Sequence, residues 1–343
     1  MKVSPMESEL NPSSVRTDSL VNADKSMRYG IAIAGMISGE LLTTKSKILR
    51  LFSVLYQVLV VIILAANFLA AAIIVCTDQR EADFFSLFVR LSFLLFIGEV
   101  TVSTLIIFIN TSNKSRLIGY YKQLSEVEQL LESLGIKLQQ KRFVRASVLA
   151  TTVGWLITIL YFASKVYDLA TNDTQDVFYD THLLKRLNST SIYQGLKTIG
   201  VVSIMYSGCD ASLGASQFFV MCFIISTLTA EFNKKYQQDV NASPNNVLSN
   251  MNQYRVVHLA ICDLVSKANE CFSAILAVKL GAEVLVLLLV FYLLSLIVAN
   301  PGETEALTIL AIWIVIAGSI IIIYIVMAER VSNEVRAVVN TIN

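Results

Sequence analysis

Residues 254–296 decide the fold, and they read YRVVHLAICDLVSKANECFSAILAVKLGAEVLVLLLVFYLLSL. In the first part, apolar residues recur at helical spacing and form a stripe. Charged residues such as Arg255, Asp263 and Lys267 lie at positions outside this stripe. From Cys271 onward only Lys279 and Glu283 are charged, and the run exceeds the roughly 20 residues that cross a bilayer. The pattern predicts one long helix, half in water and half in lipid. Its stripe, which must pack on a partner outside the membrane, comprises Val257, Ile261, Leu264, Val265 and Ala268.

The composition of the whole chain indicates a polytopic membrane protein with an all-α transmembrane bundle. Of its 343 residues, 55% are hydrophobic and only 15% are charged, whereas soluble domains carry about 25% charged residues. The formal charge of +1 and the absence of a basic or Cys/His cluster give no indication of nucleic-acid binding. The five cysteines form no C-x-x-C pair, so we expect neither a metal site, a cofactor nor a disulfide framework.

Six apolar stretches are long enough to be membrane spans. They lie at about 51–77, 84–110, 146–164, 198–230, 271–298 and 306–328. We expect residues 1–44 to form a cytosolic segment with a re-entrant or surface helix, and residues 45–343 to form the transmembrane domain. Helices from 113–145, 254–270 and 329–343 should build a cytosolic anchor domain. Residues 165–197 are expected to be an outer loop and 231–252 a polar connection containing Pro244.

The distribution of charge predicts that both termini are cytosolic. Lys45, Lys47 and Arg50 precede the first span, and the connection after the second span carries an excess of four basic residues. Basic residues concentrate in cytosolic loops. The outer loop then contains N-x-S/T sequons at Asn172 and Asn188, which are expected glycosylation sites.

Catalytic motifs are missing from the chain. There is no phosphate-binding loop, H-E-x-x-H, G-x-S-x-G or kinase element, and His182 and His258 lie on opposite sides of the predicted membrane. An enzyme is therefore not expected.

Charged residues inside spans are costly in lipid and count as functional candidates. Arg90 and Asp210, each in the outer half of a span, could form a structural pair or recognise a ligand, whereas Glu99 near mid-membrane must face protein or water. Lys279 and Glu283 are spaced i, i+4, so they could neutralise each other on one helix or serve a function.

Aromatic residues gather in the outer halves of several spans, at Tyr161, Tyr206, Tyr292 and Trp313. They could anchor the helices at the membrane interface, or they could line an outward-facing pocket for a small organic ligand. In the second interpretation these four side chains converge with Arg90 and Asp210 on one cavity.

The layout and several local motifs resemble the invertebrate gustatory receptor family of chemoreceptors. The matching motifs are Asn269-x-x-Phe272-Ser273, Tyr292-Leu293-Leu294, Trp313 and Ala328-x-x-Val331-x-x-Glu334. The resemblance implies a cell-membrane subunit of a ligand-gated, non-selective cation channel that detects small organic tastants. It also implies a homo- or hetero-tetramer with other chemoreceptor subunits, held together by the anchor domain.

One family signature does not occur in the chain. A Thr-Tyr pair followed by Gln in a seventh, pore-lining helix would fall after Asn343, so the resemblance implies a member truncated before that helix. The alternatives are a polytopic transporter or a non-conducting membrane binding protein, although paired broken helices, typical of transporters, are not clear in the sequence. A G-protein-coupled receptor is disfavoured by the cytosolic N-terminus and the even number of spans.

Overall fold

The computed structural model describes residues 47–77, 91, 94–95, 98–106, 114–171, 190–242, 244–299 and 304–342. Almost all of these residues are α-helical, which confirms the all-α expectation for this part of the chain. The labelled helices are α3 (Lys47–Thr77), α5 (Lys114–Ser133), α6 (Gln140–Thr171), α9 (Thr190–Ala242), α10 (Pro244–Ala299) and α11 (Thr304–Ile342). The expected segment 1–44, part of the span 84–110, and both sequon asparagines lie outside the described residues.

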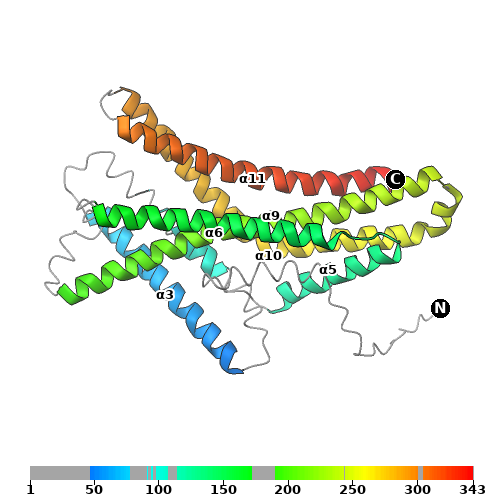
Figure 1. Cartoon of the computed structure of the whole chain (residues 1–343), viewed down its shortest axis with the longest axis horizontal. Helices are drawn as coiled ribbons and strands as arrows, with labels where there is room; N and C mark the ends of the chain where they lie inside the picture. The colour runs from blue at the N-terminus through cyan, green and yellow to red at the C-terminus, as the bar shows by residue number, and fades with distance from the viewer. Residues whose placement is uncertain are drawn as a thin grey trace.

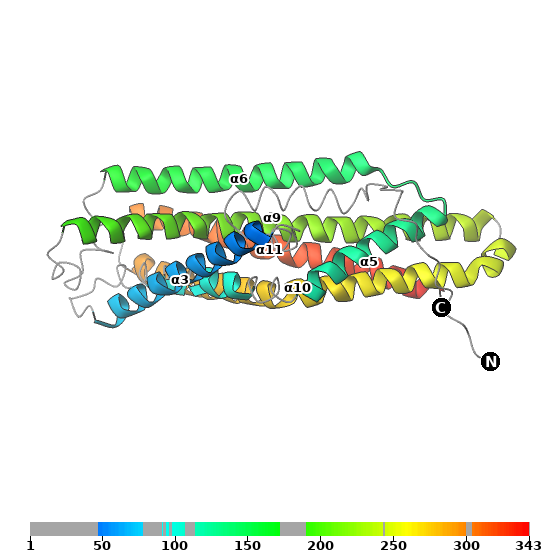
Figure 2. The same cartoon turned by 90° about the horizontal axis from the view of Figure 1, so that it is seen from below.

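The helices form an elongated bundle in which most of them run along the long axis, while α3 crosses it obliquely (Figure 1). Helix α9 packs against α6, α10 and α11, and α5 packs against α10. The turned view shows α6, α9 and α10 extended side by side (Figure 2). We call the end where α9 leads into α10 the hairpin end; the chain's C-terminus lies on the same side (Figure 1).

The prediction of a polar connection outside the helices at 231–252 is wrong. Helix α9 continues to Ala242 and α10 already begins at Pro244. Phe232 and Tyr236 from this stretch are buried, so the backbone stays helical to pack an apolar face. Proline is compatible with the first turn of a helix because the amide there has no intrahelical acceptor.

The expected outer loop 165–197 is also shorter than the sequence suggested. Helix α6 extends to Thr171 and α9 starts at Thr190. The predicted sixth span 306–328 and the helix expected after it belong to one continuous helix of 39 residues, α11, which ends at Ile342. These extensions arise because a helix that leaves the membrane can keep its backbone hydrogen bonds in water.

The turn between α5 and α6 depends on a glycine. Gly135 has φ of 77°, a left-handed conformation that side chains with a Cβ atom disfavour. The amide of Ile136 donates to the carbonyl of Leu131 at 3.1 Å, which closes the end of α5 in a Schellman arrangement. The turn sends the chain back as α6, so that Phe143 enters the same core as Tyr120 and Leu124.

The principal core of the described residues lies toward the hairpin end. It joins α5, α6, α9, α10 and α11 in one cluster, with Tyr120, Phe143 and Phe232 among its largest fully buried side chains. By contrast, α3 and the later part of α6 expose many large apolar side chains, as expected of surfaces that face lipid. By length and composition, three described helical stretches could cross a membrane: Lys141–Leu160, Gly214–Ala242 and Asn250–Tyr292.

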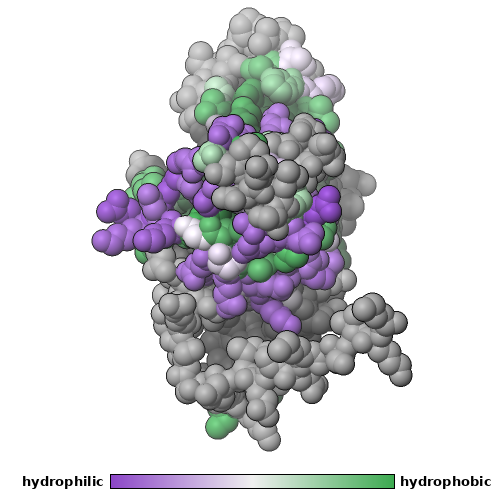
Figure 3. Space-filling model, turned by 90° about the vertical axis from the view of Figure 1, so that its right-hand side faces the viewer, coloured by the Kyte–Doolittle hydropathy of each residue, from purple (hydrophilic) through white to green (hydrophobic). Residues whose placement is uncertain are grey.

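Seen end-on from the hairpin end, the surface of the described residues is mainly hydrophilic (Figure 3). Apolar side chains show between the hydrophilic ones and not as one broad face. This polarity matches a bundle end that projects out of the bilayer into water.

Candidate functional site

A buried ion pair joins two predicted spans. Lys279 Nζ of α10 lies 3.0 Å from Glu99 Oε1, and the two side chains are only 7% and 6% exposed. Charges of opposite sign that are both removed from water must be paired closely, because an isolated charge in an apolar interior costs several kcal/mol. Glu99 thus faces protein and not lipid.

Gly214 of α9 makes room for this pair. A Cβ atom at Gly214 would lie 3.2 Å from Cε and 3.5 Å from Nζ of Lys279. Any larger side chain would displace the lysine from its present path. The sequence stretch 207–216 is rich in glycine and serine, and here that richness permits the close approach of α9 to α10.

A second carboxylate accompanies the pair. Glu283, one turn further along α10, is partly buried and interacts electrostatically with both Glu99 and Lys279. The interpretation of Lys279 and Glu283 as a self-contained intrahelical pair is therefore too simple, since Lys279 also binds a carboxylate on another span. Two buried hydroxyls, Ser103 Oγ and Thr104 Oγ1, follow Glu99 by about one turn and have no hydrogen-bond partner among the described residues.

The residues expected to bind ligand are only partly visible in the described structure. Arg90 lies outside the described residues. Tyr161, Tyr206, Asp210 and Trp313 belong to α6, α9 and α11, but their side chains are outside the described part. Tyr292 is described, and its side chain is 55% exposed on α10. The convergence of these six residues on one cavity remains a prediction.

The apolar stripe of α10 is buried within the single chain. Val257, Ile261, Leu264 and Ala268 belong to the core cluster, and Val265 packs against it. Helix α5 covers the stripe: Gln123 Nε2 donates to the carbonyl of Ala260 at 3.1 Å. Beside this core, the large apolar side chains of α10 that are exposed are Val256 and Leu259, at 51% and 66%.

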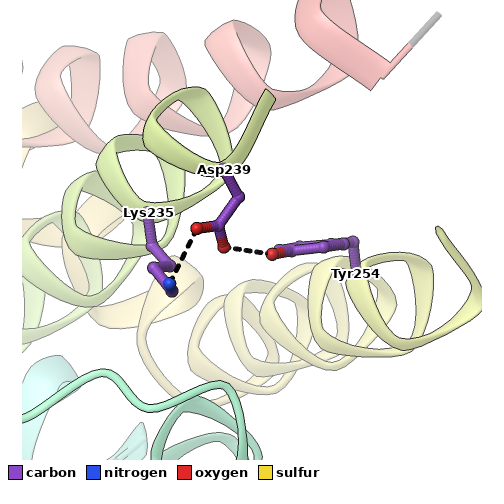
Figure 4. A network of polar contacts seen from close by, with 3 residues as sticks. All are labelled: Lys235, Asp239 and Tyr254. Carbon is purple, nitrogen blue, oxygen red and sulfur yellow. Dashed lines mark hydrogen bonds and ion pairs between the residues drawn. The ribbon is translucent and has the colours of Figure 1, made fainter. Parts of the chain in front are cut away.

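A polar network closes the hairpin end, outside the spans 198–230 and 271–298 that the sequence predicts. Lys235 Nζ donates to Asp239 Oδ1 at 2.8 Å, and the hydroxyl of Tyr254 donates to Asp239 Oδ2 (Figure 4). Burial raises the pKa of Tyr254, and the Asp239 carboxylate raises it further. Burial alone would raise the pKa of Asp239, but hydrogen bonds from Lys235 and Tyr254 outweigh it and lower that pKa.

A further side-chain hydrogen bond, which we call the second tie, links α9 to α11. Asn233 Nδ2 donates to the backbone carbonyl of Glu334 at 3.1 Å. Sequence reasoning missed this tie and the Asp239 network because it assigned no structure to 231–252. The helical spacing of Phe232, Tyr236 and Val240 was the signal that could have revealed them.

The described residues hold no group of three or more His, Cys, Asp or Glu side chains that could bind a metal ion. Cys262 Sγ lies 3.7 Å from His258 Nε2, one turn away on α10, and the two make only a pair. Burial lowers the pKa of His258 and so favours its neutral form. Cys222, Cys262 and Cys271 are free thiols.

Comparison with known proteins gives a family and a fold. A family model described as "7tm Chemosensory receptor" matches residues 26–342. Among solved structures, the insect olfactory receptor OR5 from Machilis hrabei matches with a TM-score of 0.63 and 13% identity, covering 92% of this chain and 81% of that one. At this identity the likeness is one of fold alone. A search of curated protein sequences found no significant match.

Proposed function

The chain belongs to the 7tm chemosensory receptor family, and from that premise we propose that it is a gustatory subunit of a ligand-gated, non-selective cation channel. It is a multi-pass membrane protein and a receptor, not an enzyme. Small organic tastants are its proposed ligands, and the cell membrane its proposed location.

The observation that carries this proposal is the continuity of α9, α10 and α11. Each helix runs without interruption from an apolar stretch to the core at the hairpin end. A ligand that tilts the outer part of such a helix therefore also moves the part that projects from the membrane. The likeness to an olfactory receptor over most of the chain shows that the same helical fold extends through these parts.

The proposed ligand site consists of Arg90, Tyr161, Tyr206, Asp210, Tyr292 and Trp313 in the outer halves of the spans. Apolar walls with a few polar groups suit a small organic molecule. We place both termini in the cytosol, which puts the hairpin end there too and the sequons Asn172 and Asn188 outside. Asn172→Gln and Asn188→Gln should each remove one glycosidase-sensitive mass step, and tags at either terminus should stain only in permeabilised cells.

Assembly into a homo- or hetero-tetramer through the anchor domain completes the proposal. The exposed pair Val256 and Leu259 offers an apolar contact there that the chain itself does not cover. The buried stripe from Val257 to Ala268 fixes the orientation of α10, and this orientation leaves Val256 and Leu259 available for the contact between subunits.

The test is electrical recording from cells that express the chain alone and together with other chemoreceptor subunits. Application of small organic compounds should evoke currents carried by sodium and potassium alike. Arg90→Gln or Asp210→Asn should shift the concentration for half-maximal response, while Lys267→Gln on the exposed surface should not. A compound that binds without current would favour a non-conducting binding protein, and its accumulation in vesicles would favour a transporter.

A further inference from the structure

Four basic side chains lie exposed where the α5–α6 turn leads into α6. They are Lys137, Lys141, Arg142 and Arg145, all within nine residues. Between Glu132 and Asp168 the sequence contains no acidic residue. The patch therefore has no neutralising partner along its own segment, and we call these four residues the basic patch.

The outward face of α6 changes from basic to apolar along its length. Val144, Val148 and Leu149 are exposed next to the basic patch, and exposed Leu156 and Ile157 continue the apolar surface. Phe143 and Ala150 point the other way, into the core. A bilayer leaflet presents the same order of chemistry, with charged headgroups followed by hydrocarbon.

The basic patch is held by packed structure and is not part of a loose tail. The guanidinium of Arg142 lies 5.6 Å from the ring centroid of Phe223 on α9. The neighbouring Phe143 packs edge-on against the same ring at 6.1 Å. Gly135 and its capping hydrogen bonds fix the turn before Lys137. Rigid presentation of several charges lowers the entropy cost of binding a charged partner.

We propose that the basic patch binds the headgroups of anionic phospholipids in the cytosolic leaflet, with polyphosphorylated headgroups as the strongest ligands. Clusters of four or more basic residues immediately cytosolic of a span are typical of such recognition. The adjoining apolar side chains would contact the acyl chains, which an acidic protein or a free phosphate lacks. This inference rests on the proposed topology, which places the hairpin end in the cytosol.

The experiment uses the full chain in mild detergent, titrated with dioctanoyl phosphatidylinositol bisphosphate and followed by native mass spectrometry and thermal unfolding. The test variant combines Lys137→Gln, Lys141→Gln and Arg145→Gln and leaves the packed Arg142 in place. We expect it to bind the lipid at least tenfold more weakly, since each basic residue near a headgroup contributes a similar amount of favourable binding free energy.

The matched control removes three exposed basic residues elsewhere: Lys234→Gln, Arg255→Gln and Arg336→Gln. It changes the net charge equally and should keep the wild-type affinity. Dioctanoyl phosphatidylcholine and inositol trisphosphate separate the contributions of charge and acyl chain, and both should bind more weakly than the anionic lipid. Lipid-free unfolding and elution profiles show that each variant is folded.

Three results would overturn the inference: equal loss of affinity in the control, unchanged affinity in the test variant, or inositol trisphosphate binding as tightly as the lipid. Lipid binding is measured without channel activity, so a chain that fails to conduct can still satisfy this test. Conversely, a receptor that conducts ions but does not bind anionic lipid would contradict the proposed lipid binding and leave the proposed channel function intact. Staining of either terminal tag in intact cells would remove the topology on which it rests.

Discussion

The position of Lys279 depends on its neighbours, because its side chain is buried in a predicted span. Glu99 supplies the opposite charge at 3.0 Å, and Gly214 supplies the space. Neither neighbour could have been paired with Lys279 from the sequence, since they lie far from it along the chain. Helical periodicity predicts which face a residue occupies but not which helix it meets.

Removing one member of the ion pair should destabilise the receptor strongly. Lys279→Met leaves the Glu99 carboxylate buried without its partner, which costs about 3–5 kcal/mol and should lower the thermal unfolding midpoint in detergent. The double variant Glu99→Gln, Lys279→Met should recover most of the loss. Lys267→Met breaks the exposed pair with Glu270 and should cost no more than about 1 kcal/mol. A single Lys279→Met variant as stable as wild type would contradict this account.

Gly214 offers an independent test of the same contact. Gly214→Leu should lower the unfolding midpoint because its side chain would collide with Cε of Lys279, which is tethered by the ion pair. Gly281→Leu is the matched control, since a Cβ atom at Gly281 has no neighbour within 4 Å. Similar effects of both substitutions would show that helix propensity, and not the contact with Lys279, determines the result.

At the level of helices, the α9–α10 hairpin shows what sequence patterns can and cannot predict. Residues 254–296 belong to one continuous helix, as predicted, and the apolar stripe of this helix is buried. The preceding stretch 231–252 was misjudged because a water-exposed helix has the polar composition of a loop. Pro244 strengthened the error, although proline is over-represented at the first position of a helix.

The Asp239 network predicts a pH dependence for this hairpin. Because the folded protein lowers the pKa of Asp239, its carboxylate stabilises the fold above the ordinary aspartate value of about 4. That contribution is lost as the pH falls through the lowered folded value. The side chain is 29% exposed, so the effect should be about 1 kcal/mol or less.

Asp239→Asn should lower stability at pH 7 and leave less difference between pH 7 and pH 3 than wild type shows. Tyr254→Phe, which removes the hydroxyl donor, should act in the same direction. Thermal unfolding measured at both pH values checks the prediction. A wild-type protein whose stability difference equals that of Asp239→Asn would rule out a contribution from this carboxylate.

At the scale of the whole molecule, the structure separates residues that fold the chain from residues that could join chains. Leu264 is fully buried, whereas Leu259 is 66% exposed on the same helix. Sequence periodicity predicted that a helix at 117–134 could cover part of the stripe, and α5 does pack there. Periodicity could not predict how completely the stripe is buried within one chain, so it could not separate these roles. The full ligand site likewise needs the relative placement of five spans, which no single-helix pattern contains.

Leu259→Glu should weaken the proposed tetramer while leaving the unfolding midpoint of the subunit nearly unchanged. Leu264→Asp should instead reduce stability by several kcal/mol because it buries an unpaired carboxylate. Mass measurement in mild detergent, combined with thermal unfolding, distinguishes the two outcomes. A Leu259→Glu variant that remains tetrameric would exclude this surface from the subunit contact.

The position of Gly214 within α9 has a mechanical consequence. Helix α9 contains 53 residues and is therefore about 80 Å long, and Gly214 lies two residues from its midpoint. A tilt of about 5° around that midpoint would carry each end through roughly 3.5 Å, in opposite directions, but would shift Gly214 by only about 0.3 Å. A rigid tilt of α9 around its midpoint would therefore move both ends of the helix while leaving the contact between Gly214 and Lys279 almost unchanged.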